Sequence, residues 1–423
     1  MENGQISTLN NIIYFERYAY PRQFIDEGME QDTFLCVVVP IFNEPDITKC
    51  LKSLYSCFKP KCNVEIILVV NHAQGSSIEI KEQSRKTVLQ AASLINAKKI
   101  AWLKCHVIQA FDLPNKKAGV GLARKIGMDE AAYRFNRNRK DGIIVCFDAD
   151  SYCQQNYFMA IEDAFIIDPK KSGASIHYEH PIYGSEGKIN MPIVLYETHL
   201  RYYIQALTYT GYPYAFHTIG SSMAVRASIY QKSGGMNTRK AGEDFYFLHK
   251  IIPLGGFINI TNTTITPSAR ESDRVPFGTG KAIKSHNNKD KLLGYTYNFS
   301  IFKELKLFFE LVNVGFEQNL IPITILTFLK EQNLISELMV IEENATNKAH
   351  FQERFYQWFN GFKVLKCVHY LKEHYYPDLE IVAAVQQLYD QDPRFKQKRP
   401  AKLDSLYYLR SLRTFEKDLN YTI

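Results

Sequence analysis

Four apolar runs mark the first 150 residues, and polar side chains follow three of them. The runs read FLCVVVPIF at 34–42, VEIILVV at 64–70, WLKCHVIQA at 102–110 and IIVCF at 143–147. Continuous apolar runs of this length are typical of strands covered on both faces of a parallel sheet. The pattern therefore predicts four strands, of which the first, second and fourth are expected to be buried, and we expect Pro40 to end the first.

The segments between these runs have the spacing of helices. We predict helices over 46–58, with Asp46 as a candidate N-cap, over 78–96 and over 121–135. Strand and helix thus alternate, which predicts an α/β fold: a doubly wound, mostly parallel sheet with helices on both faces. Ligands bind such sheets at the carboxyl ends of the strands. The polar residues expected there are Asn43, Glu44, Asn71, His72, Asp148 and Asp150.

The pattern changes near residue 288. The segment FQERFYQWFNGFKVL places aromatic residues at helical spacing, with charges opposite them. We therefore expect an N-terminal segment at 1–33, an α/β domain at 34–287 and a helical C-terminal extension at 288–423.

The composition limits which binding partners and which cellular compartment fit this sequence. The net charge of +7 over 423 residues fits an anionic ligand or a membrane surface, whereas a nucleic-acid binder would show a more concentrated basic stripe. The one basic cluster is RFKQKRPAK at 394–402, and the best apolar segment, LIPITILTFL, is far shorter than the about 20 residues of a membrane span. The eight cysteines form no CxxC pair, which indicates free thiols rather than a zinc site. We expect a cytoplasmic protein, with peripheral contact to the inner face of a membrane left open.

Asp148 and Asp150 follow the fourth strand directly. Where the chain turns at the end of a strand, both carboxylates can reach one site. Oxygen ligands select hard cations, and Mg²⁺ or Mn²⁺ keeps coordination positions open for phosphate oxygens. The pair therefore predicts a divalent metal that holds a phosphate group, while a capping aspartate beside a solvated one is the structural alternative.

Four segments in order resemble the family-2 glycosyltransferases of the GT-A fold. They are VVVPIFNEPD, the pair of aspartates, IGSSMAVRASIYQKSGGM and GEDFYFLHKI, and the resemblance covers about residues 34–275. It implies transfer of a sugar from a UDP- or GDP-sugar donor, with inversion at the anomeric carbon. It also implies that 34–150 is the nucleotide-binding half and 151–287 the acceptor half of a catalytic domain.

The resemblance assigns roles to individual residues. Those implied for the donor nucleotide and its diphosphate are Pro40, Phe42, Asn43, Glu44, Asn71, Gly121, Arg124 and Asp148. Asp150 is implied as the residue that contacts the metal, with Asp148 on the ribose or on metal-bound water. Two positions depart from the family pattern, since Asn71 replaces an aspartate that reads the base and Lys125 replaces an asparagine.

Glu243 and Asp244 match the family's acidic pair near the acceptor. The resemblance makes Asp244 the catalytic base, and a carboxylate that takes the proton of the attacking hydroxyl accelerates transfer by roughly 10²–10⁴-fold. We expect the helix that starts here to keep Asp244 ionised through its dipole. The alternative is an acidic pair that only stabilises the first turn.

Arg270 and Arg274 lie in SARESDRVPFGTG, within a loop at 267–280 that we expect to be mobile. Guanidinium groups pair with phosphate oxygens, so this loop suits closure on a diphosphate. A solvated loop in which arginine pairs with Asp273 is the alternative.

The sequence also allows other interpretations of its tyrosines, its histidines and the class of protein. Tyrosines at 191–214 suit either an acceptor surface, for a saccharide or a lipid-linked acceptor, or helix packing. His177 and His180 are expected to be structural, and His72 and His249 are weak site candidates. A haloacid dehalogenase-type phosphatase would place its aspartates at the start of the fold, and a nucleotidyltransferase would open on a Gly-rich loop. A degenerate member that binds nucleotide-sugar as a scaffold is the alternative to an enzyme.

Overall fold

A computed structural model describes residues 13–184, 186–271, 278–287, 293–396, 398 and 402–418. Arg274 and part of the expected loop at 267–280 lie outside the described residues, as does part of the basic cluster at 394–402.

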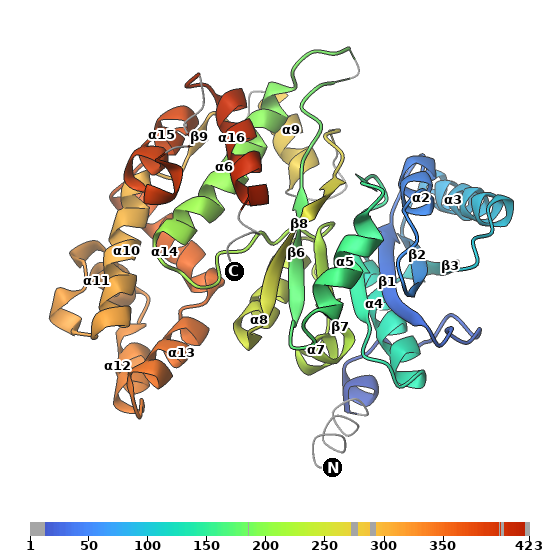
Figure 1. The fold of residues 1–423 in the computed structure, drawn as a ribbon, viewed down its shortest axis with the longest axis horizontal. Helices are drawn as coiled ribbons and strands as arrows, with labels where there is room; N and C mark the ends of the chain where they lie inside the picture. The colour runs from blue at the N-terminus through green and yellow to red at the C-terminus, as the bar shows by residue number, and fades with distance from the viewer. Residues whose placement is uncertain are drawn as a thin grey trace.

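Eight of the described strands build one large mixed sheet with the order β3-β2-β1-β4-β7-β6-β8-β5 (Figure 1), and β9 (Tyr295–Thr296) and β10 (Leu379–Glu380) of the C-terminal region form a separate pair. The strands of the large sheet are β1 (Thr33–Ile41), β2 (Asn63–Ala73), β3 (Leu103–Leu113), β4 (Ile143–Cys146), β5 (Tyr152–Cys153), β6 (Gly173–Tyr178), β7 (Met223–Arg226) and β8 (Phe257–Thr266). The pairs β3–β2, β2–β1, β1–β4 and β6–β8 are parallel, whereas β4–β7, β7–β6 and β8–β5 are antiparallel. The predicted fold class, a mostly parallel α/β sheet, is confirmed.

Helices cover both faces of this sheet. The helices of the α/β part are α2 (Thr48–Tyr55), α3 (Ile78–Ala97), α4 (Val120–Arg137), α5 (Tyr157–Ile166), α6 (Met191–Tyr209), α7 (Ala227–Lys232), α8 (Glu243–Ile251) and α9 (Thr279–Asn287). Along β1, Val37 and Val39 belong to a core with α2, α3 and α5, while Cys36 and Val38 belong to a core with α4, α7 and α8. The alternation follows from the two-residue period of a strand.

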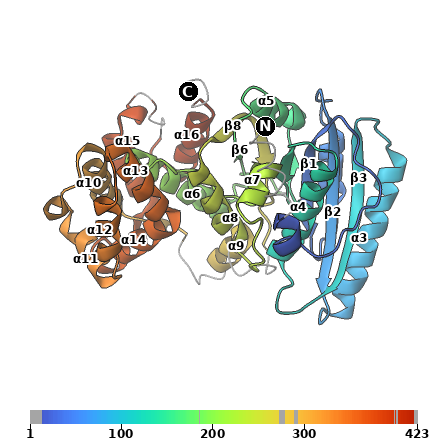
Figure 2. The ribbon, with the colours of Figure 1, turned by 90° about the horizontal axis from the view of Figure 1, so that it is seen from below.

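The C-terminal region is helical, as predicted, and lies at the end of the molecule opposite α3 (Figure 2). Its elements are β9 (Tyr295–Thr296), α10 (Phe299–Val314), α11 (Ile323–Glu331), α12 (Ile335–Glu343), α13 (Lys348–Trp358), α14 (Gly361–His374), β10 (Leu379–Glu380), α15 (Ile381–Gln391) and α16 (Ser405–Asp418). Short 3₁₀ turns lie at Ile252–Leu254, Gln318–Leu320 and Pro393–Phe395. None of the described helices is both long and apolar enough to cross a bilayer.

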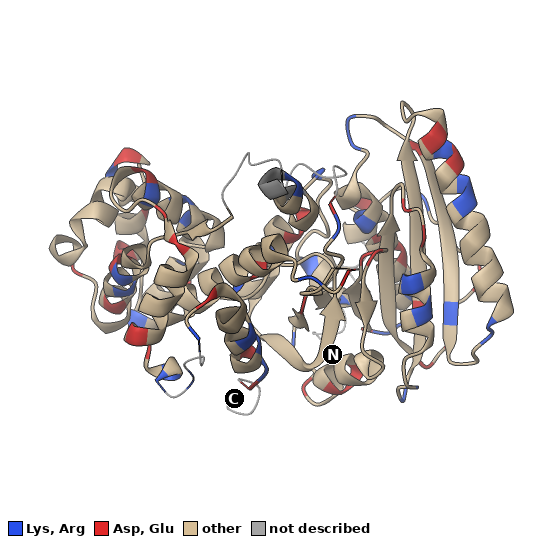
Figure 3. Ribbon diagram, turned by 90° about the horizontal axis from the view of Figure 1, so that it is seen from above, with Lys and Arg blue, Asp and Glu red and all other residues tan. Residues whose placement is uncertain are grey.

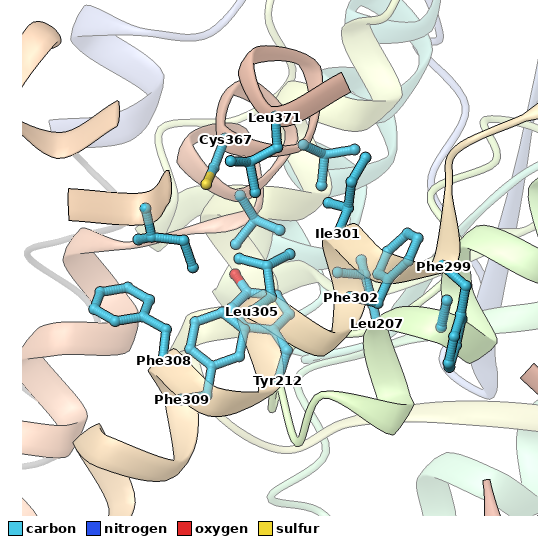
Figure 4. Packing of buried hydrophobic residues seen from close by; sticks show 14 of the residues in the cluster. Leu207, Tyr212, Phe299, Ile301, Phe302, Leu305, Phe308, Phe309, Cys367 and Leu371 are labelled. Carbon is cyan, nitrogen blue, oxygen red and sulfur yellow. The ribbon is translucent and has the colours of Figure 1, made fainter. Parts of the chain in front are cut away.

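A third hydrophobic core joins α6 to this helical region. Leu207 and Tyr212 pack with Phe302, Phe309 and other buried side chains of α10 and α14 (Figure 4). Tyr202 is also buried there, and its hydroxyl donates to the Tyr297 carbonyl over 2.9 Å. Several tyrosines of 191–214 therefore serve helix packing, the second of the two readings of this stretch.

Two details of the first strand and helix differ from expectation. β1 continues through Pro40 to Ile41, because β4 pairs with β1 only as far as Val38 and no bond on that side needs the missing N–H. Asp46 precedes the N-cap position, which Ile47 occupies, although its carboxylate still accepts from the Thr48 amide over 2.8 Å.

Candidate active site

The site lies at the carboxyl ends of β1 and β4, which are neighbours in the sheet although two strands separate them in the chain. The chain leaves β1 on one side, through β2 and β3, and continues from β4 on the other. A doubly wound sheet has its ligand crevice at such a reversal. The segment after β1 carries Asn43 and Glu44, and the segment after β4 carries Asp148 and Asp150. Asn43 has a left-handed backbone (φ 46°), a conformation that asparagine tolerates.

Arg124 joins the two acidic motifs. It projects from the first turns of α4, is 2% exposed, and donates to Asp148 Oδ1 over 2.7 Å and to Glu243 Oε1. Burial alone would lower the pKa of this guanidinium, but Glu243 and Asp148 raise it above its usual range. Arg124 is therefore a buried, permanently charged cation between β4 and α8.

The carboxyls around Arg124 hold their protons more strongly than usual. Burial raises the pKa of Glu243 to about 7, Arg124 opposes this rise, and the charges of Asp244 and Asp148 add to it. Burial also raises the pKa of Asp148, Arg124 opposes this rise, and the charges of Asp150 and Asp244 add to it, although 39% of the side chain is exposed. Arg124 thus offsets only part of the negative charge of Asp148, Glu243 and Asp244.

Asp244 lies in the first turn of α8, where the sequence placed it. Burial raises the pKa of Asp244, against Arg124 and backbone N–H donors that include those of Phe245 and Gly220. Its Oδ1 accepts from the Phe245 amide over 2.8 Å. Desolvation thus raises the pKa of Asp244, while N–H groups at the start of the helix act in the expected direction and favour the ionised form.

Two glycines allow this close packing. A Cβ on Gly220 would lie 2.6 Å from Arg124 Nη1 and 2.9 Å from Asp244 Oδ2. A Cβ on Gly121 would collide with the Arg239 carbonyl, in the segment that leads to α8. From the sequence we expected Gly121 to lie at the site of the donor nucleotide. No role was expected for Gly220, although it lies in one of the segments on which the resemblance rests.

Arg270 bridges the segments that follow β1 and β4. Its guanidinium donates to both carboxylate oxygens of Glu44, one of them at 3.0 Å, and to Asp150 Oδ2 over 3.2 Å. From the sequence we expected Arg270 to bind a diphosphate. Its partners in the structure, Glu44 and Asp150, lie more than a hundred residues away in the chain and were not predicted.

Asn71 and Lys125, the two residues that depart from the family pattern, both contact other groups of the protein. The Asn71 side chain, 2% exposed, donates to the Ile41 carbonyl over 2.8 Å and so ties β2 to the end of β1. Lys125 Nζ lies 3.0 Å from Asp129 Oδ2, on the side of α4 that meets the N-terminal segment at Tyr14. Pro40 is buried and Phe42 is partly exposed at the same edge. Their roles toward a donor remain predictions.

The four histidines considered from the sequence have partners other than the acidic residues around Arg124. His72 stacks on Phe111 with ring centroids 4.6 Å apart, and His177 contacts Glu179 at 3.0 Å. His180 binds Glu197 through Nδ1 at 2.9 Å. Burial lowers the pKa of His249 to about 4.

Tyr196 is a site residue that the sequence did not single out from its tyrosine-rich surroundings. Burial raises the pKa of Tyr196 to about 12, a hydrogen bond with Thr279 opposes this, and the nearby Asp244 charge adds to it. This tyrosine of α6 therefore lies near Asp244 and near Thr279, the first residue of α9. No spacing signal could have separated it from the tyrosines that pack in the core.

The donor set after β4 fits a hard divalent cation. Asp148 and Asp150 offer carboxylate oxygens, with 39% and 23% of their side chains exposed. Within the described part of the chain no three His, Cys, Asp or Glu side chains gather as a metal site. An ion held by this pair would complete its coordination with substrate and water oxygens, as Mg²⁺ commonly does.

Comparison with known proteins supports the resemblance. Residues 36–234 match the model of glycosyl transferase family 2. This range contains most of β1, Arg124, the two aspartates and Gly220, and it ends shortly before α8. The resemblance found in the motifs is therefore confirmed for this range, which covers just under half of the chain.

Solved structures give weaker likenesses. Staphylococcus aureus TarS 1–349 in complex with UDP-GlcNAc is 14% identical, with 92% of each chain covered and a TM-score of 0.37. The mannosyltransferase PcManGT from Pyrobaculum calidifontis, in complex with GDP-Man and Mn²⁺, is 13% identical over 87% of this chain and 96% of that one, also at 0.37. No curated protein matches the sequence.

Proposed function

We propose that this protein is an inverting glycosyltransferase that moves a sugar from a UDP- or GDP-sugar to a hydroxyl of a saccharide or lipid-linked acceptor. The observation that supports it best is the convergence of Asp148, Glu243 and Asp244 around Arg124, at the crevice of a family 2 domain. A buried cation ties the acidic motif that follows β4 to the acidic motif that begins α8.

In the proposed reaction Asp244 is the general base. The acceptor hydroxyl attacks the anomeric carbon, the bond from that carbon to the diphosphate oxygen breaks, and the hydroxyl proton passes to the Asp244 carboxylate. The raised pKa of Asp244 lies closer to neutral pH than that of an ordinary aspartate. A carboxylate with such a pKa accepts a proton more effectively. The N–H of Phe245 fixes one carboxylate oxygen and thereby the direction of the other.

Asp148 and Asp150 would hold Mn²⁺ or Mg²⁺, and the bound ion would supply positive charge to the leaving diphosphate. Arg270 lies at the same place and pairs with Asp150 and Glu44. In the proposal this guanidinium also binds the diphosphate, since its fork matches phosphate oxygens as it matches carboxylates.

The test of the donor site is thermal stabilisation by UDP and GDP, with and without Mn²⁺. We expect one nucleotide to raise Tm more strongly with the metal, and Asp150→Ala to remove the metal-dependent part. Asp163→Ala is the matched control, because Asp163 is 51% exposed in a surface pair with Lys61. Wild-type stabilisation of the Asp150→Ala variant by nucleotide and Mn²⁺ together would show that the metal assignment is wrong.

A catalytically degenerate scaffold is the second candidate. Two features favour it: Asn71 is engaged with Ile41, and both metal-motif aspartates pair with arginine. Release of free sugar from a nucleotide-sugar panel by the wild-type protein with Mn²⁺ would exclude this candidate. Binding without any turnover would favour it.

A further inference from the structure

Arg270 places a positive charge against one of the two proposed metal ligands. Its Nη2 donates to Asp150 Oδ2 over 3.2 Å and also to Glu44 Oε2, while its Nη1 donates to Glu44 Oε1 over 3.0 Å. Burial would lower the pKa of this guanidinium, but Glu44 and Asp150 raise it above its usual range. Arg270 is therefore charged whenever a ligand binds near neutral pH.

The two contacts of Arg270 differ in strength. Glu44 is 1% exposed and accepts from Arg270 through both carboxylate oxygens, whereas Asp150 is 23% exposed and accepts from it through Oδ2. Removing one partner of a buried ion pair is strongly disfavoured, while an exposed pair contributes little to stability. We therefore expect Arg270 to remain on Glu44 and to release Asp150 first.

A divalent cation on Asp150 would meet this guanidinium at close range. Mg²⁺ binds carboxylate oxygens at about 2.1 Å, and Arg270 Nη2 lies 3.2 Å from Asp150 Oδ2. Like charges this close repel each other strongly where water is partly excluded. Basic and acidic residues are interspersed over the described ribbon (Figure 3), so the repulsion depends on the neighbouring guanidinium more than on the net charge of the molecule.

A diphosphate can reach Arg270 and reverse this balance. The Arg270 side chain is 36% exposed, whereas Arg124 is 2% exposed and held by Asp148 and Glu243. Phosphate oxygens pair with a guanidinium as carboxylate oxygens do, so a bound diphosphate competes with Asp150 for Nη2. Its negative charge also offsets the repulsion between Arg270 and an ion on Asp150.

We propose that Arg270 opposes metal binding at Asp150 until a nucleotide diphosphate engages it, and that the nucleotide and the metal therefore bind together. The inference rests on the proposed function and adds a coupling between the two ligands of that site. In this role Arg270 is a positioning residue, which acts on the ion through Asp150. Because such coupling is reciprocal, a nucleotide that raises the affinity for the ion is itself bound more tightly by the same factor.

The probe is Mn²⁺ alone, titrated without nucleotide and followed by the electron paramagnetic resonance signal of the free ion. Arg270→Gln should bind Mn²⁺ at least about tenfold more tightly than the wild-type protein, because a like charge is removed from Asp150. Arg270→Lys keeps the charge and should remain within about threefold of the wild-type affinity. Addition of UDP or GDP should raise the Mn²⁺ affinity of the wild-type protein by a larger factor than that of Arg270→Gln.

Lys140→Gln is the matched control, because Lys140 is exposed just before β4, at the opposite end of that strand from Asp148. It removes the same charge and should bind Mn²⁺ as the wild-type protein does. Glu44→Gln/Arg270→Gln leaves no buried charge at position 44, so it replaces the single variant if that one does not fold. It should also bind Mn²⁺ more tightly than the wild-type protein. Melting temperatures of all variants verify folding.

Unchanged or weaker Mn²⁺ binding by Arg270→Gln, or an equal gain in Arg270→Lys, would overturn the inference and leave the proposed donor site intact. Asp150→Ala/Arg270→Gln locates the ion, and we expect this variant to lose the gain in affinity. If it binds Mn²⁺ as tightly as Arg270→Gln does, the ion lies elsewhere, and the metal assignment fails together with the inference. Thermal stabilisation by nucleotide without metal reports separately on the donor site.

Discussion

At the scale of single residues, Arg124 determines how the acidic motifs act together. The sequence placed Arg124 near the donor by resemblance, whereas its contacts in the structure are Asp148 and Glu243. A buried carboxylate without a partner is strongly disfavoured, so the arginine permits two of them to remain close. The same arginine limits how far the pKa of each carboxyl rises.

Replacing Arg124 with Met should therefore destabilise the protein by about 3–5 kcal/mol, the range for breaking a buried ion pair from one side. Arg124→Lys should be intermediate, since it restores the charge but not the planar fork that reaches both Asp148 and Glu243. Urea unfolding followed by circular dichroism measures both variants. Wild-type stability of Arg124→Met would mean that the carboxyls need no cation.

Asp244→Asn separates chemistry from binding. The amide keeps the size of the side chain but cannot take a proton, so transfer should fall by roughly 10²-fold or more. Nucleotide affinity should remain within a few-fold of the wild-type value, because the proposed metal residues lie on another element. Calorimetric nucleotide binding and a transfer assay on one preparation provide both numbers. Near-normal turnover would contradict the assignment of Asp244 as base.

At the scale of elements, the sequence predicted the first half of the sheet well and the second half poorly. β1, β2 and β4 are buried apolar runs, whereas β3 at the edge of the sheet is only partly buried. The ends of the strands also differ: β2 runs to Ala73 because Asn71 still pairs with β3. β5 has only two residues, which is too few for a pattern, and β5 and β7 pair antiparallel with their neighbours, which an alternation of strands and crossover helices does not predict. The acidic motifs were found from local sequence, but their connection through Arg124 depends on the fold.

The junction before β7 provides a test at this scale. Gly220→Ala would place a methyl group against Arg124 and Asp244, and overpacking of this kind typically destabilises by about 1–3 kcal/mol. We expect a folded protein with transfer reduced more than about tenfold, because the displaced side chains form the proposed site. Gly28→Ala is the control, since a Cβ there meets nothing within 4 Å. Equal activity of the two variants would show that the site tolerates the shift.

At the scale of the whole molecule, buried ion pairs fasten the last helix to the α/β domain. Arg413 of α16 donates to Glu197 of α6 over 2.7 and 2.6 Å and to the His180 carbonyl over 2.8 Å. Glu416 of α16 accepts from Arg201 of α6 and contacts His217 at 3.2 Å. These partners are about two hundred residues apart in the chain, so no sequence pattern could pair them. The helical C-terminal region is thereby held against the element that carries Tyr196.

This attachment should make the stability of the protein sensitive to acid. Arg201 and the imidazole of His217 lower the pKa of Glu416 to about 2 against the effect of its burial, and His177 and Lys417 do the same for Glu179. A carboxyl whose pKa is lower in the folded state stabilises that state above its unfolded pKa of about 4.5 and loses this contribution as pH falls toward 2. Each of the two groups then contributes on the order of 3 kcal/mol at neutral pH.

The free energy of unfolding should therefore fall steeply between about pH 5 and pH 2 in urea titrations. Glu416→Gln should be less stable than the wild-type protein at pH 7, because Arg201 loses its charged partner, and the two curves should converge as Glu416 becomes protonated in the wild-type protein. Glu310→Gln is the control, since Glu310 is 53% exposed in a surface pair with Lys306 and should change stability by less than about 0.5 kcal/mol. A constant difference between wild type and Glu416→Gln from pH 7 to pH 2.5 would mean that this carboxyl does not titrate with the attachment of α16.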